Sequence, residues 1–350
     1  MNPSDLLRVA FDHAVEAAQA ECLIPYLNEL PGIDGKTRFL VVGKAAAQHA
    51  SIAAECLGDI EGLCIIPKGH QVSTTLTVIE ASHPVPDAGS LQAAEAALAL
   101  AQSLGPDDRL VCLISGGGSA LMSAPLVSMD PDLKMRTHQA LLASGATISE
   151  LNTVRKQLSL VKGGRLVEAC QGHVLNFLVS DVPGDRVEFI ASGPTVPAHT
   201  NQSDAIEVLT RYQIDLLDEL LPWLSNADYA TPQPDSDCFQ RVTTTIVAAP
   251  SQSLKQAQAF LESEGVECWL LGDSIEGDSV TVARVMAETA LWQRRHRRLE
   301  RPLCLLSGGE TTVKVVADGI GGPNAHFALA LLDALEGTRG ISAIICDTDG

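Results

Sequence analysis

Three consecutive glycines, Gly116, Gly117 and Gly118, lie between Ser115 and Ser119, directly after an apolar segment over residues 110–114. Glycine can adopt a positive φ and lets the backbone approach a ligand closely, because it has no side chain. Where such a loop opens a helix, the first amides have no partner inside the helix and attract anions. The segment therefore predicts a phosphate-binding loop, although a tight turn that serves packing alone has the same pattern.

A shorter version of this pattern occurs near the C-terminus, where Ser307, Gly308, Gly309 and Glu310 follow the apolar residues 303–306. The likeness favours a second contact with nucleotide phosphates. The repeated succession of a strand and a turn explains it equally well, so both interpretations stay open.

Two further residues that could contact an anionic ligand follow other predicted strands. Lys44 comes after the strand-like residues 39–42 and begins a helical stretch. A cation is unfavourable beside a helix N-terminus, so an anionic ligand would explain it; a lysine that extends into solvent is the alternative. His83, in the segment SHPVPD, is expected either to contact substrate or to hold a proline-rich turn.

Two carboxylates and a serine lie in the segment SDVPGDRVEFIASGPT, which follows a predicted strand over residues 174–179. Mg²⁺ prefers one or two carboxylates together with phosphate oxygens and water, so Asp181 and Asp185 are candidate ligands. Their alternative role is that of ordinary Asx-turn residues. Ser192 is a candidate for contact with the substrate.

Two adjacent cations, Arg155 and Lys156, lie in the segment NTVRKQLSLVKGGRL. Such side chains suit the carboxylate or phosphate of a substrate. The alternative is a solvated face of the helix that Thr147 and Glu150 begin as a capping box.

The elements that must position these residues alternate between short apolar strands and helices. Continuous apolar strands separated by helices indicate a parallel sheet covered on both faces. Ligands of such sheets bind at the carboxyl ends of the strands, where the glycine loop and Lys44 are expected. We predict strands at residues 39–42, 63–66, 76–81, 110–115 and 174–179, and helices at residues 3–22, after Lys44, at residues 90–104 and through the 150s.

An acidic, proline-containing stretch over residues 217–237 is the best candidate for a domain boundary, which we place near residue 235. The predicted fold is α/β, with a Rossmann-like parallel sheet flanked by helices in residues 1–235 and a smaller α/β domain in residues 236–350. In the second domain we predict strands at residues 242–248, 268–271, 303–306 and 341–346, and helices at residues 253–264 and up to about 298.

The overall composition limits the classes of function. The formal net charge of -19 argues against a nucleic-acid partner, because phosphate backbones are bound by clustered Lys and Arg. No run of about 18 apolar residues could span a bilayer, and the N-terminus lacks the apolar centre of a signal peptide. We therefore expect a cytoplasmic protein without a membrane partner. Its nine cysteines lack a paired spacing and indicate reduced thiols.

Neither of the two common nucleotide-binding signatures is present. The P-loop pattern GxxxxGKS or GxxxxGKT cannot be fitted around Lys44, and GxGxxG fails after Gly116 because Leu121 occupies the final position. An ordinary P-loop enzyme and a standard dinucleotide-binding domain are both disfavoured.

Taken together, the motifs resemble those of the class II glycerate 2-kinases, which have a C-terminal MOFRL domain. The resemblance covers essentially the whole chain, and the combination is far more specific than any one glycine turn. It rests on VGKAA (42–46), SHPVPD (82–87), SGGGSAL (115–121), NTVRKQLSLVKGGRL (152–166), SDVPGD (180–185), SGPT (192–195), SGGETTV (307–313) and TDG (348–350).

The resemblance implies ATP-dependent phosphorylation of D-glycerate at its 2-hydroxyl, with Mg²⁺, in a cleft between two α/β domains of which the second is of MOFRL type. Lys44 then matches the family lysine that acts on the transferring phosphoryl group. A homodimer stays open. The implied site comprises a nucleotide-phosphate set, Ser115, Gly116, Gly117, Gly118, Ser119, Gly308, Gly309 and Glu310; a set for a small hydroxy acid, His83, Arg155, Lys156 and Ser192; and the Mg²⁺ ligands Asp181 and Asp185.

The chain departs from the family pattern in two places. It reads GGPNAH at residues 321–326 where the family reads GGRNQE, so Pro323 replaces an arginine with a phosphate-facing role. It also stops at TDG, where family members continue, so we expect the second domain to be incomplete. The alternative function is a non-catalytic relative that binds a nucleotide or a phosphorylated acid. A weaker alternative is an NAD(P)H-dependent hydroxypyruvate reductase, a name that some family members carry.

Overall fold

A computed structural model describes residues 2–296, 300–313 and 321–347 of the chain. Within these ranges the chain forms two compact units. We call residues 20–180 and 186–247 the larger unit, and residues 1–19, 181–185 and 248–350, with the gaps just given, the smaller unit. Each unit is described by itself.

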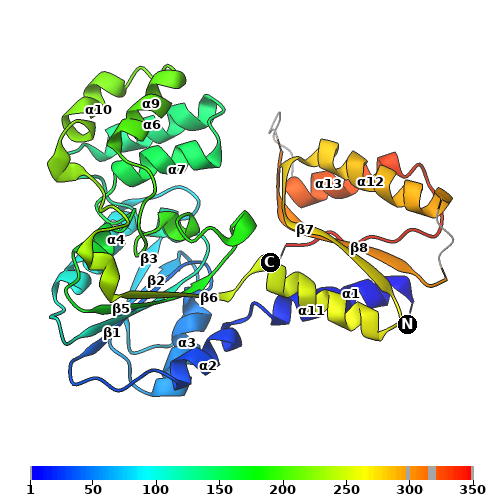
Figure 1. The fold of residues 1–350 in the computed structure, drawn as a ribbon, viewed down its shortest axis with the longest axis horizontal. Coiled ribbons are helices and arrows are strands. Elements are labelled where there is room, and N and C mark those ends of the chain that lie inside the picture. The colour runs from blue at the N-terminus through cyan, green and yellow to red at the C-terminus, as the bar shows by residue number, and fades with distance from the viewer. Residues whose placement is uncertain (1, 297–299, 314–320, 348–350) are drawn as a thin grey trace. The chain divides into compact units, whose positions relative to one another are not determined.

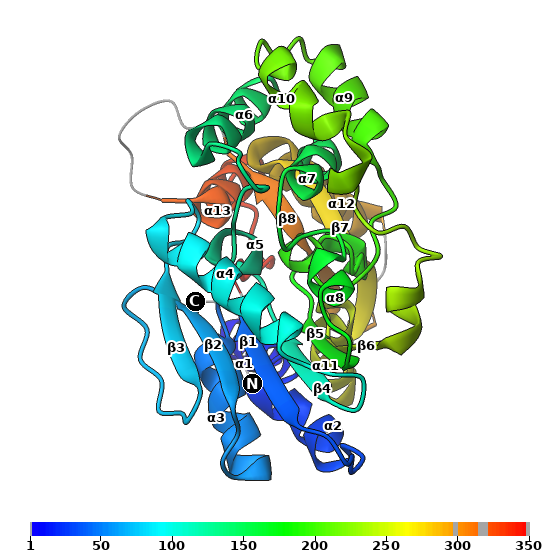
Figure 2. The ribbon, with the colours of Figure 1, turned by 90° about the vertical axis from the view of Figure 1, so that its left-hand side faces the viewer.

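The larger unit is built on a six-stranded sheet with the strand order β3-β2-β1-β4-β5-β6. The first five strands pair in parallel, with Val42 of β1 beside Ile114 of β4. Figure 2 shows these strands side by side. The strands are β1 (Thr37–Val42), β2 (Gly62–Pro67), β3 (Thr77–Ala81), β4 (Arg109–Ile114), β5 (His173–Val179) and β6 (Val242–Ala248).

Helices cover both faces of this sheet, as the continuous apolar strands require. In β1, Phe39 and Val41 face a core with α3 and α2, and the alternate residues, Leu40 and Val42, are also fully buried. Figure 1 shows α3 and α2 below the sheet and α4 above it. The bounds are α2 (Ile24–Asn28), α3 (Ala46–Leu57), α4 (Ala88–Gln102), the short α5 (Gly118–Leu121) and α8 (Arg165–Glu168), and the 3₁₀ turns η1 (Ala20–Leu23), η3 (Ile190–Ser192) and η5 (Asp237–Arg241).

A separate helical layer with its own apolar core belongs to the same unit (Figure 1). Thr147 and Glu150 form the predicted capping box at the start of α7, with Glu150 N–H donating to Thr147 Oγ1 at 3.3 Å. The core of the layer includes Leu133, Val154 and Leu209. The layer comprises α6 (Pro131–Ala143), α7 (Ile148–Gln157), α9 (Gln202–Arg211), α10 (Leu217–Leu224) and the 3₁₀ turn η4 (Ala227–Tyr229).

The smaller unit has a parallel two-stranded sheet between two pairs of helices. On one side α1 packs against α11 through a core that contains Ala14 and Leu261, and on the other side α12 packs against α13 (Figure 1). The elements are α1 (Pro3–Glu16), η2 (Pro183–Asp185), α11 (Pro250–Ser263), β7 (Glu267–Asp278), α12 (Ser279–His296), β8 (Leu303–Thr312) and α13 (Pro323–Ala334).

Most predicted strands and helices are confirmed, together with the α/β class, but four predictions are wrong. Residues 242–248 form the edge strand of the larger sheet, not the first strand of a second domain, because the free edge of β5 accepts β6; Asn176 Nδ2 donates to Thr244 Oγ1 at 2.9 Å. The N-terminal helix ends at Glu16 and not at residue 22. The predicted boundary near residue 235 between two domains is not tested by these observations and stays a prediction.

The third wrong prediction is the turn at Ser307, Gly308, Gly309 and Glu310, which lie inside β8. A Cβ on Gly309 would lie 2.1 Å from the carbonyl oxygen of Ile275, where the pairing with β7 is irregular. Glycine is therefore needed for close approach of two strands, not for a turn.

The fourth wrong prediction is a strand at residues 341–346, which have no regular secondary structure. An apolar run forms a strand only where a neighbouring edge takes its backbone hydrogen bonds. Residues 297 and 298 of the predicted long helix and the TDG motif lie outside the described residues. In the described part of the chain no helix has the length and apolarity to cross a membrane.

His49, on α3, provides a test of this core. Its side chain is 1% exposed, and neither ring nitrogen has a hydrogen-bond partner among the described residues. Burial lowers the pKa of His49 to about 4 from 6.5. Between these values the unfolded chain binds a proton that the folded protein excludes, so stability falls as the pH falls from 6.5 to 4.

In wild type, we expect the free energy of unfolding to fall by roughly 1 kcal/mol for each pH unit below 6.5, because the unfolded chain binds about one more proton than the folded protein. His49→Leu should remove most of this pH dependence. Urea unfolding at several pH values between 4 and 7 measures it. Equal pH slopes for the two proteins would contradict a neutral, buried His49.

Candidate functional site

The turns after β1 and β4 meet at the carboxyl edge of the larger sheet, where the strand order reverses direction. Lys44 N–H donates to Gly116 O at 2.8 Å, and Ser115 N–H donates to Val42 O at 3.0 Å. Ala45 N–H donates to Ser115 Oγ at 3.2 Å, so this hydroxyl joins the two turns. Open parallel sheets bind ligands at such a reversal point, as the sequence led us to expect of Lys44 and the glycine loop.

Two glycines allow this close approach. A Cβ on Gly43, whose φ is 134°, would lie 2.1 Å from Ser115 Oγ. A Cβ on Gly117, whose φ is 82°, would lie 3.1 Å from Lys44 Cγ and 3.2 Å from the His83 ring. Three residues that were predicted separately, Lys44, His83 and Gly117, therefore lie together.

The end of the glycine loop contacts a second predicted segment. Ser119 Oγ lies 2.8 Å from Ser192 Oγ, which donates to Asn152 Oδ1 at 3.1 Å. A Cβ on Gly118 would lie 2.8 Å from the Cβ of Ala191. Glycine at position 118 thus lets the loop and the turn around Ser192 pack without a gap.

The turn around Ser192 has an unusual backbone. Ala191 and Ser192 have φ values of 51° and 60°, although neither is glycine. Residues in this region cost about 1–3 kcal/mol each and are concentrated at functional sites. Ser192 is fully buried, and its carbonyl accepts a hydrogen bond from Gly163 N–H at 3.1 Å.

Arg155 and Lys156, in the last turn of α7, point into different surroundings. Arg155 Nη1 lies 3.4 Å from Ser119 Oγ, beside the glycine loop. Lys156 is 3% exposed, and its ammonium lies 5.0 Å from the centre of the Phe189 ring. Burial lowers the pKa of Lys156 to about 8. The alternative of a solvated helix face is therefore wrong for Lys156.

Sequence reasoning missed two further lysines beside the loop. Lys162 Nζ donates to Ser119 O at 2.6 Å and to Met122 O at 3.0 Å. Lys134 Nζ donates to Ala124 O at 2.8 Å and to Ser123 Oγ at 3.2 Å. Lys162 is in the segment that drew attention to Arg155, whereas nothing in the local sequence marks Lys134.

These cations repel one another and are held in place by neutral oxygens. Burial and the charge of Arg155 lower the pKa of Lys134 to about 7, and burial lowers the pKa of Arg155 to about 10. Burial, with Lys134 and Arg155 nearby, also lowers the pKa of Lys162 well below its usual value. Arg155 thus keeps its positive charge at neutral pH, whereas burial disfavours the charged forms of the two lysines. An anionic ligand would be attracted by Arg155 and would favour protonation of Lys134 and Lys162.

The remaining predicted site residues belong to the smaller unit. Asp181 and Asp185 lie in the segment 181–185, and one carboxylate oxygen of Asp185 is buried with no hydrogen-bond partner among the described residues. Gly308, Gly309 and Glu310 lie in β8. The described residues include no cluster of three or more His, Cys, Asp or Glu that could hold a metal ion.

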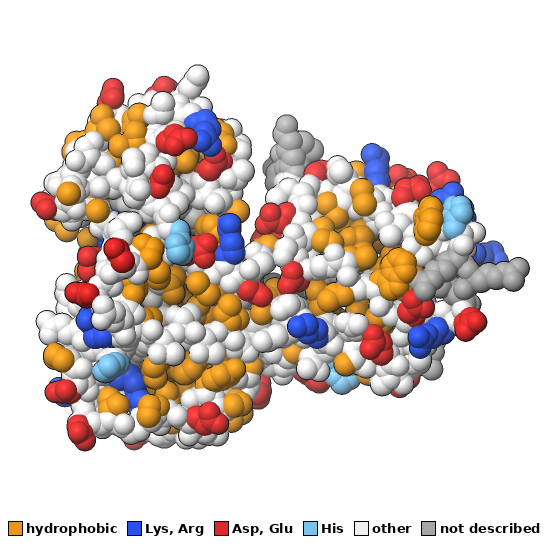
Figure 3. Space-filling view, viewed as in Figure 1, with side chains coloured by type: hydrophobic (Ala, Val, Ile, Leu, Met, Phe, Trp, Pro, Cys, Tyr) orange, Lys and Arg blue, Asp and Glu red, His pale blue; other side chains and the backbone are white. Residues whose placement is uncertain are grey.

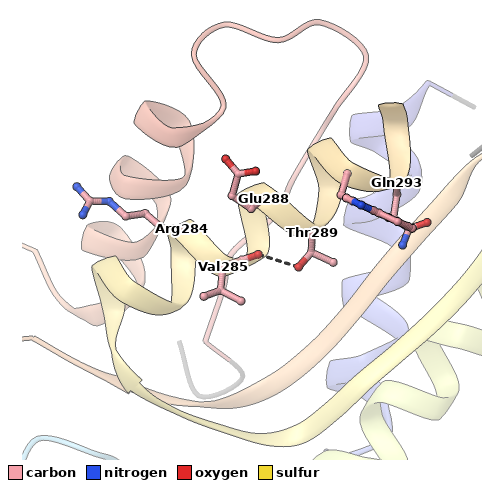
Figure 4. Close-up of a pocket in the computed structure, with 6 residues that line it drawn as sticks. Arg284, Val285, Glu288, Thr289 and Gln293 are labelled. Carbon is pink, nitrogen blue, oxygen red and sulfur yellow. Dashed lines mark hydrogen bonds between the residues drawn. The ribbon is translucent and has the colours of Figure 1, made fainter. Parts of the chain in front are cut away.

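The smaller unit also has a shallow hollow of about 550 Å³ along α12, lined by residues from Arg284 to Gln293. Figure 4 shows its walls, with Thr289 Oγ1 donating to Val285 O at 2.7 Å. Hydrophobic side chains are exposed on this unit (Figure 3), and they include Val285, Trp292, Leu329 and Leu332. No predicted site residue lines the hollow.

The sequence is similar to two known families and to several named proteins. It matches the family described as "Domain of unknown function (DUF4147)" over residues 6–225 and the MOFRL family over residues 303–350. A protein of Agrobacterium vitis with the provisional name hydroxypyruvate reductase is 43% identical over 99% of this chain and 79% of its own length. The D-glycerate 2-kinase of Thermotoga maritima is 33% identical over 100% of this chain and 84% of its own length.

The fold is also similar to that of a solved structure. The crystal structure of glycerate kinase from Thermotoga maritima matches with a TM-score of 0.83 and 32% sequence identity, covering 97% of this chain and 82% of the other. The comparison supports the α/β class and the succession of elements described above.

The contact between the glycine loop and the turn around Ser192 can be tested with Gly118→Ala. The added methyl would overlap Ala191, so we expect a loss of about 1–3 kcal/mol in the free energy of unfolding. Gly32→Ala is the control, since a Cβ on Gly32 has no atom within 4 Å. Equal stability of the two variants in urea would show that the loop and the turn do not touch.

Proposed function

Because the chain belongs to the glycerate 2-kinase family, with its DUF4147 and MOFRL domains, we propose that it phosphorylates D-glycerate at the 2-hydroxyl with ATP and Mg²⁺, giving 2-phosphoglycerate. The observation that carries this proposal is the meeting of Lys44 with the glycine loop at the carboxyl edge of the sheet. In the reaction the 2-hydroxyl oxygen forms a bond to the γ-phosphorus, and the bond between that phosphorus and the β–γ bridging oxygen breaks to release ADP. The hydroxyl proton passes to solvent.

Phosphoryl transfer depends mostly on position and on stabilisation of charge. We assign the amides of Gly117, Gly118 and Ser119 to the nucleotide phosphates, since they begin α5 and have no partner inside that helix. Lys44 supplies a positive charge beside the same loop. Such preorganised donors and cations stabilise the charge that develops on the transferring group.

The hydroxy acid is assigned to the neighbouring polar groups. Arg155 and Ser192 both contact Ser119, and His83 lies beside Lys44 and Gly117. These contacts support a substrate position next to the phosphate loop. Lys156 lies over Phe189 instead, so its assignment to the substrate rests on the motif alone.

The proposed Mg²⁺ ligands are Asp181 and Asp185. One carboxylate oxygen of Asp185 is buried and has no hydrogen-bond partner among the described residues, which fits a ligand for a hard cation. Two carboxylates are sufficient, because Mg²⁺ takes its other ligands from phosphates and water. When bound, the ion would neutralise negative charge on the phosphates.

Gly308, Gly309 and Glu310 stay predicted contacts of the nucleotide.

A second candidate is a non-catalytic relative that binds a nucleotide or a phosphorylated acid. The observation that favours it is Pro323, which occupies the first turn of α13 in place of the family arginine. Proline suits the first turn of a helix, which explains its presence there structurally. Unlike arginine, it supplies no positive charge to the phosphates.

An NAD(P)H-dependent reductase is the third candidate, supported by the name of the Agrobacterium vitis relatives and by the Rossmann-like strand order. The turn after β1 argues against it, because it reads Gly43, Lys44 and Ala45 where a dinucleotide fingerprint needs further glycines. A fluorescence titration with NADPH distinguishes the reductase from the kinase. Saturable binding of NADPH would support the reductase.

The role of Lys44 is tested by Lys44→Met. We expect kcat for ADP release with D-glycerate to fall by about 10²-fold or more while the fold is retained, because one preorganised cation is lost. Circular dichroism checks the fold. Lys255→Met, on the exposed surface of α11, is the matched control and should keep full activity. A folded Lys44→Met variant with normal kcat would remove Lys44 from the mechanism.

The role of position 323 is tested by Pro323→Arg. We expect a gain in kcat, by analogy with arginine fingers, whose effects reach about 10³–10⁵. Pro323→Ala controls for the loss of proline at the start of α13. If Pro323→Arg is no faster than Pro323→Ala, the arginine is not the missing element.

A further inference from the structure

Arg155 is held by three neutral groups. Its Nη1 lies 3.4 Å from Ser119 Oγ and 3.5 Å from Asn152 Oδ1. Its Nη2 lies 3.0 Å from Nε2 and 3.3 Å from Nδ1 of His138, which comes from α6. A guanidinium can only donate, so the imidazole is the acceptor in this contact.

Within the described residues, no carboxylate forms an ion pair with Arg155 or with the two nearby lysines, Lys134 and Lys162. Buried charges without partners are costly, so such a group is expected to serve a ligand of opposite charge. The ammonium groups of both lysines donate to the loop over residues 119–124. The Arg155 guanidinium contacts the Ser119 hydroxyl instead, which in turn contacts the Ser192 hydroxyl.

A histidine is suited to hold this arginine without cancelling its charge. Burial, together with the charges of Arg155 and Lys134, lowers the pKa of His138 to about 4, so the ring is neutral at neutral pH. An Asp or Glu at the same place would form an ion pair and weaken the attraction of Arg155 for an external anion. A neutral imidazole fixes the side chain and leaves its full charge available.

We propose that His138 is a positioning residue that holds the Arg155 guanidinium toward Ser119 and Ser192, so that Arg155 receives the carboxylate of the hydroxy acid. The inference rests on the proposed kinase function, because it assigns the substrate carboxylate within that site. His138 itself does not touch the substrate.

The test measures equilibrium binding of D-glycerate by calorimetry without ATP, and KM and kcat with ATP and Mg²⁺. His138→Phe and His138→Leu both remove the two ring nitrogens that lie 3.0 Å and 3.3 Å from Arg155 Nη2, whereas His138→Gln retains an acceptor near the Nε2 position. We expect the first two variants to raise Kd and KM for D-glycerate about tenfold, the equivalent of part of a charged hydrogen bond. Their kcat and their KM for ATP should change less than about twofold.

The rescue and the chemical control separate positioning from a general loss of structure. His138→Gln should keep most of the wild-type affinity for D-glycerate. His173→Phe is the control: His173 begins β5, away from the carboxyl edge of the sheet, so this variant should behave like the wild type. Methyl D-glycerate lacks the negative charge, so its binding should change little. The preference for D-glycerate over the ester should therefore fall in His138→Phe, and in His138→Leu if His138→Phe does not fold.

The outcomes distinguish the two claims. If the wild type phosphorylates D-glycerate but His138→Phe and His138→Leu bind it normally, the positioning role is wrong and the proposed function stands. Equal weakening of D-glycerate and its methyl ester would also overturn the inference, since it would show a merely structural role. If the wild type neither binds nor phosphorylates D-glycerate, both the proposed function and the inference fail.

Discussion

The hydrogen bond from Lys44 N–H to Gly116 O joins the turns that follow β1 and β4, and the proposed site depends on it. The two strands are neighbours where the strand order reverses, so their carboxyl ends open onto the same edge of the sheet. The approach is close enough that no side chain fits at Gly43 or Gly118. A glycine loop, a lysine and the strained turn at Ser192 are thereby brought together from distant parts of the sequence.

The electrostatics of this edge differ from those of the whole chain. The formal net charge is -19, yet Arg155, Lys134 and Lys162 lie beside the glycine loop without an ion-pair partner among the described residues. Local potential at a binding site depends on nearby groups more than on net charge. An acidic protein can therefore bind small anions such as ATP and a hydroxy acid while it repels nucleic acid. The neutral His138 keeps this local charge intact.

The sequence could predict the features that depend on local pattern. Apolar strands, the capping box at Thr147 and the glycine loop at residues 116–118 all have signatures within a few residues. Features that depend on a partner far along the chain could not be found this way: β6 joins a sheet edge formed by β5, and Gly309 serves the approach of β7. His138 was missed for the same reason, since only the packing of α6 beside α7 gives it a partner.

The central claim is transfer of phosphate from ATP to the 2-hydroxyl of glycerate, and identification of the product tests it most directly. The protein would be incubated with ATP, Mg²⁺ and D-glycerate, and the phosphorylated acid identified by ³¹P and ¹³C NMR. The account predicts 2-phosphoglycerate, formed in step with ADP. Formation of 3-phosphoglycerate would contradict the assigned position, and the absence of any glycerate-dependent ADP would contradict the kinase function itself.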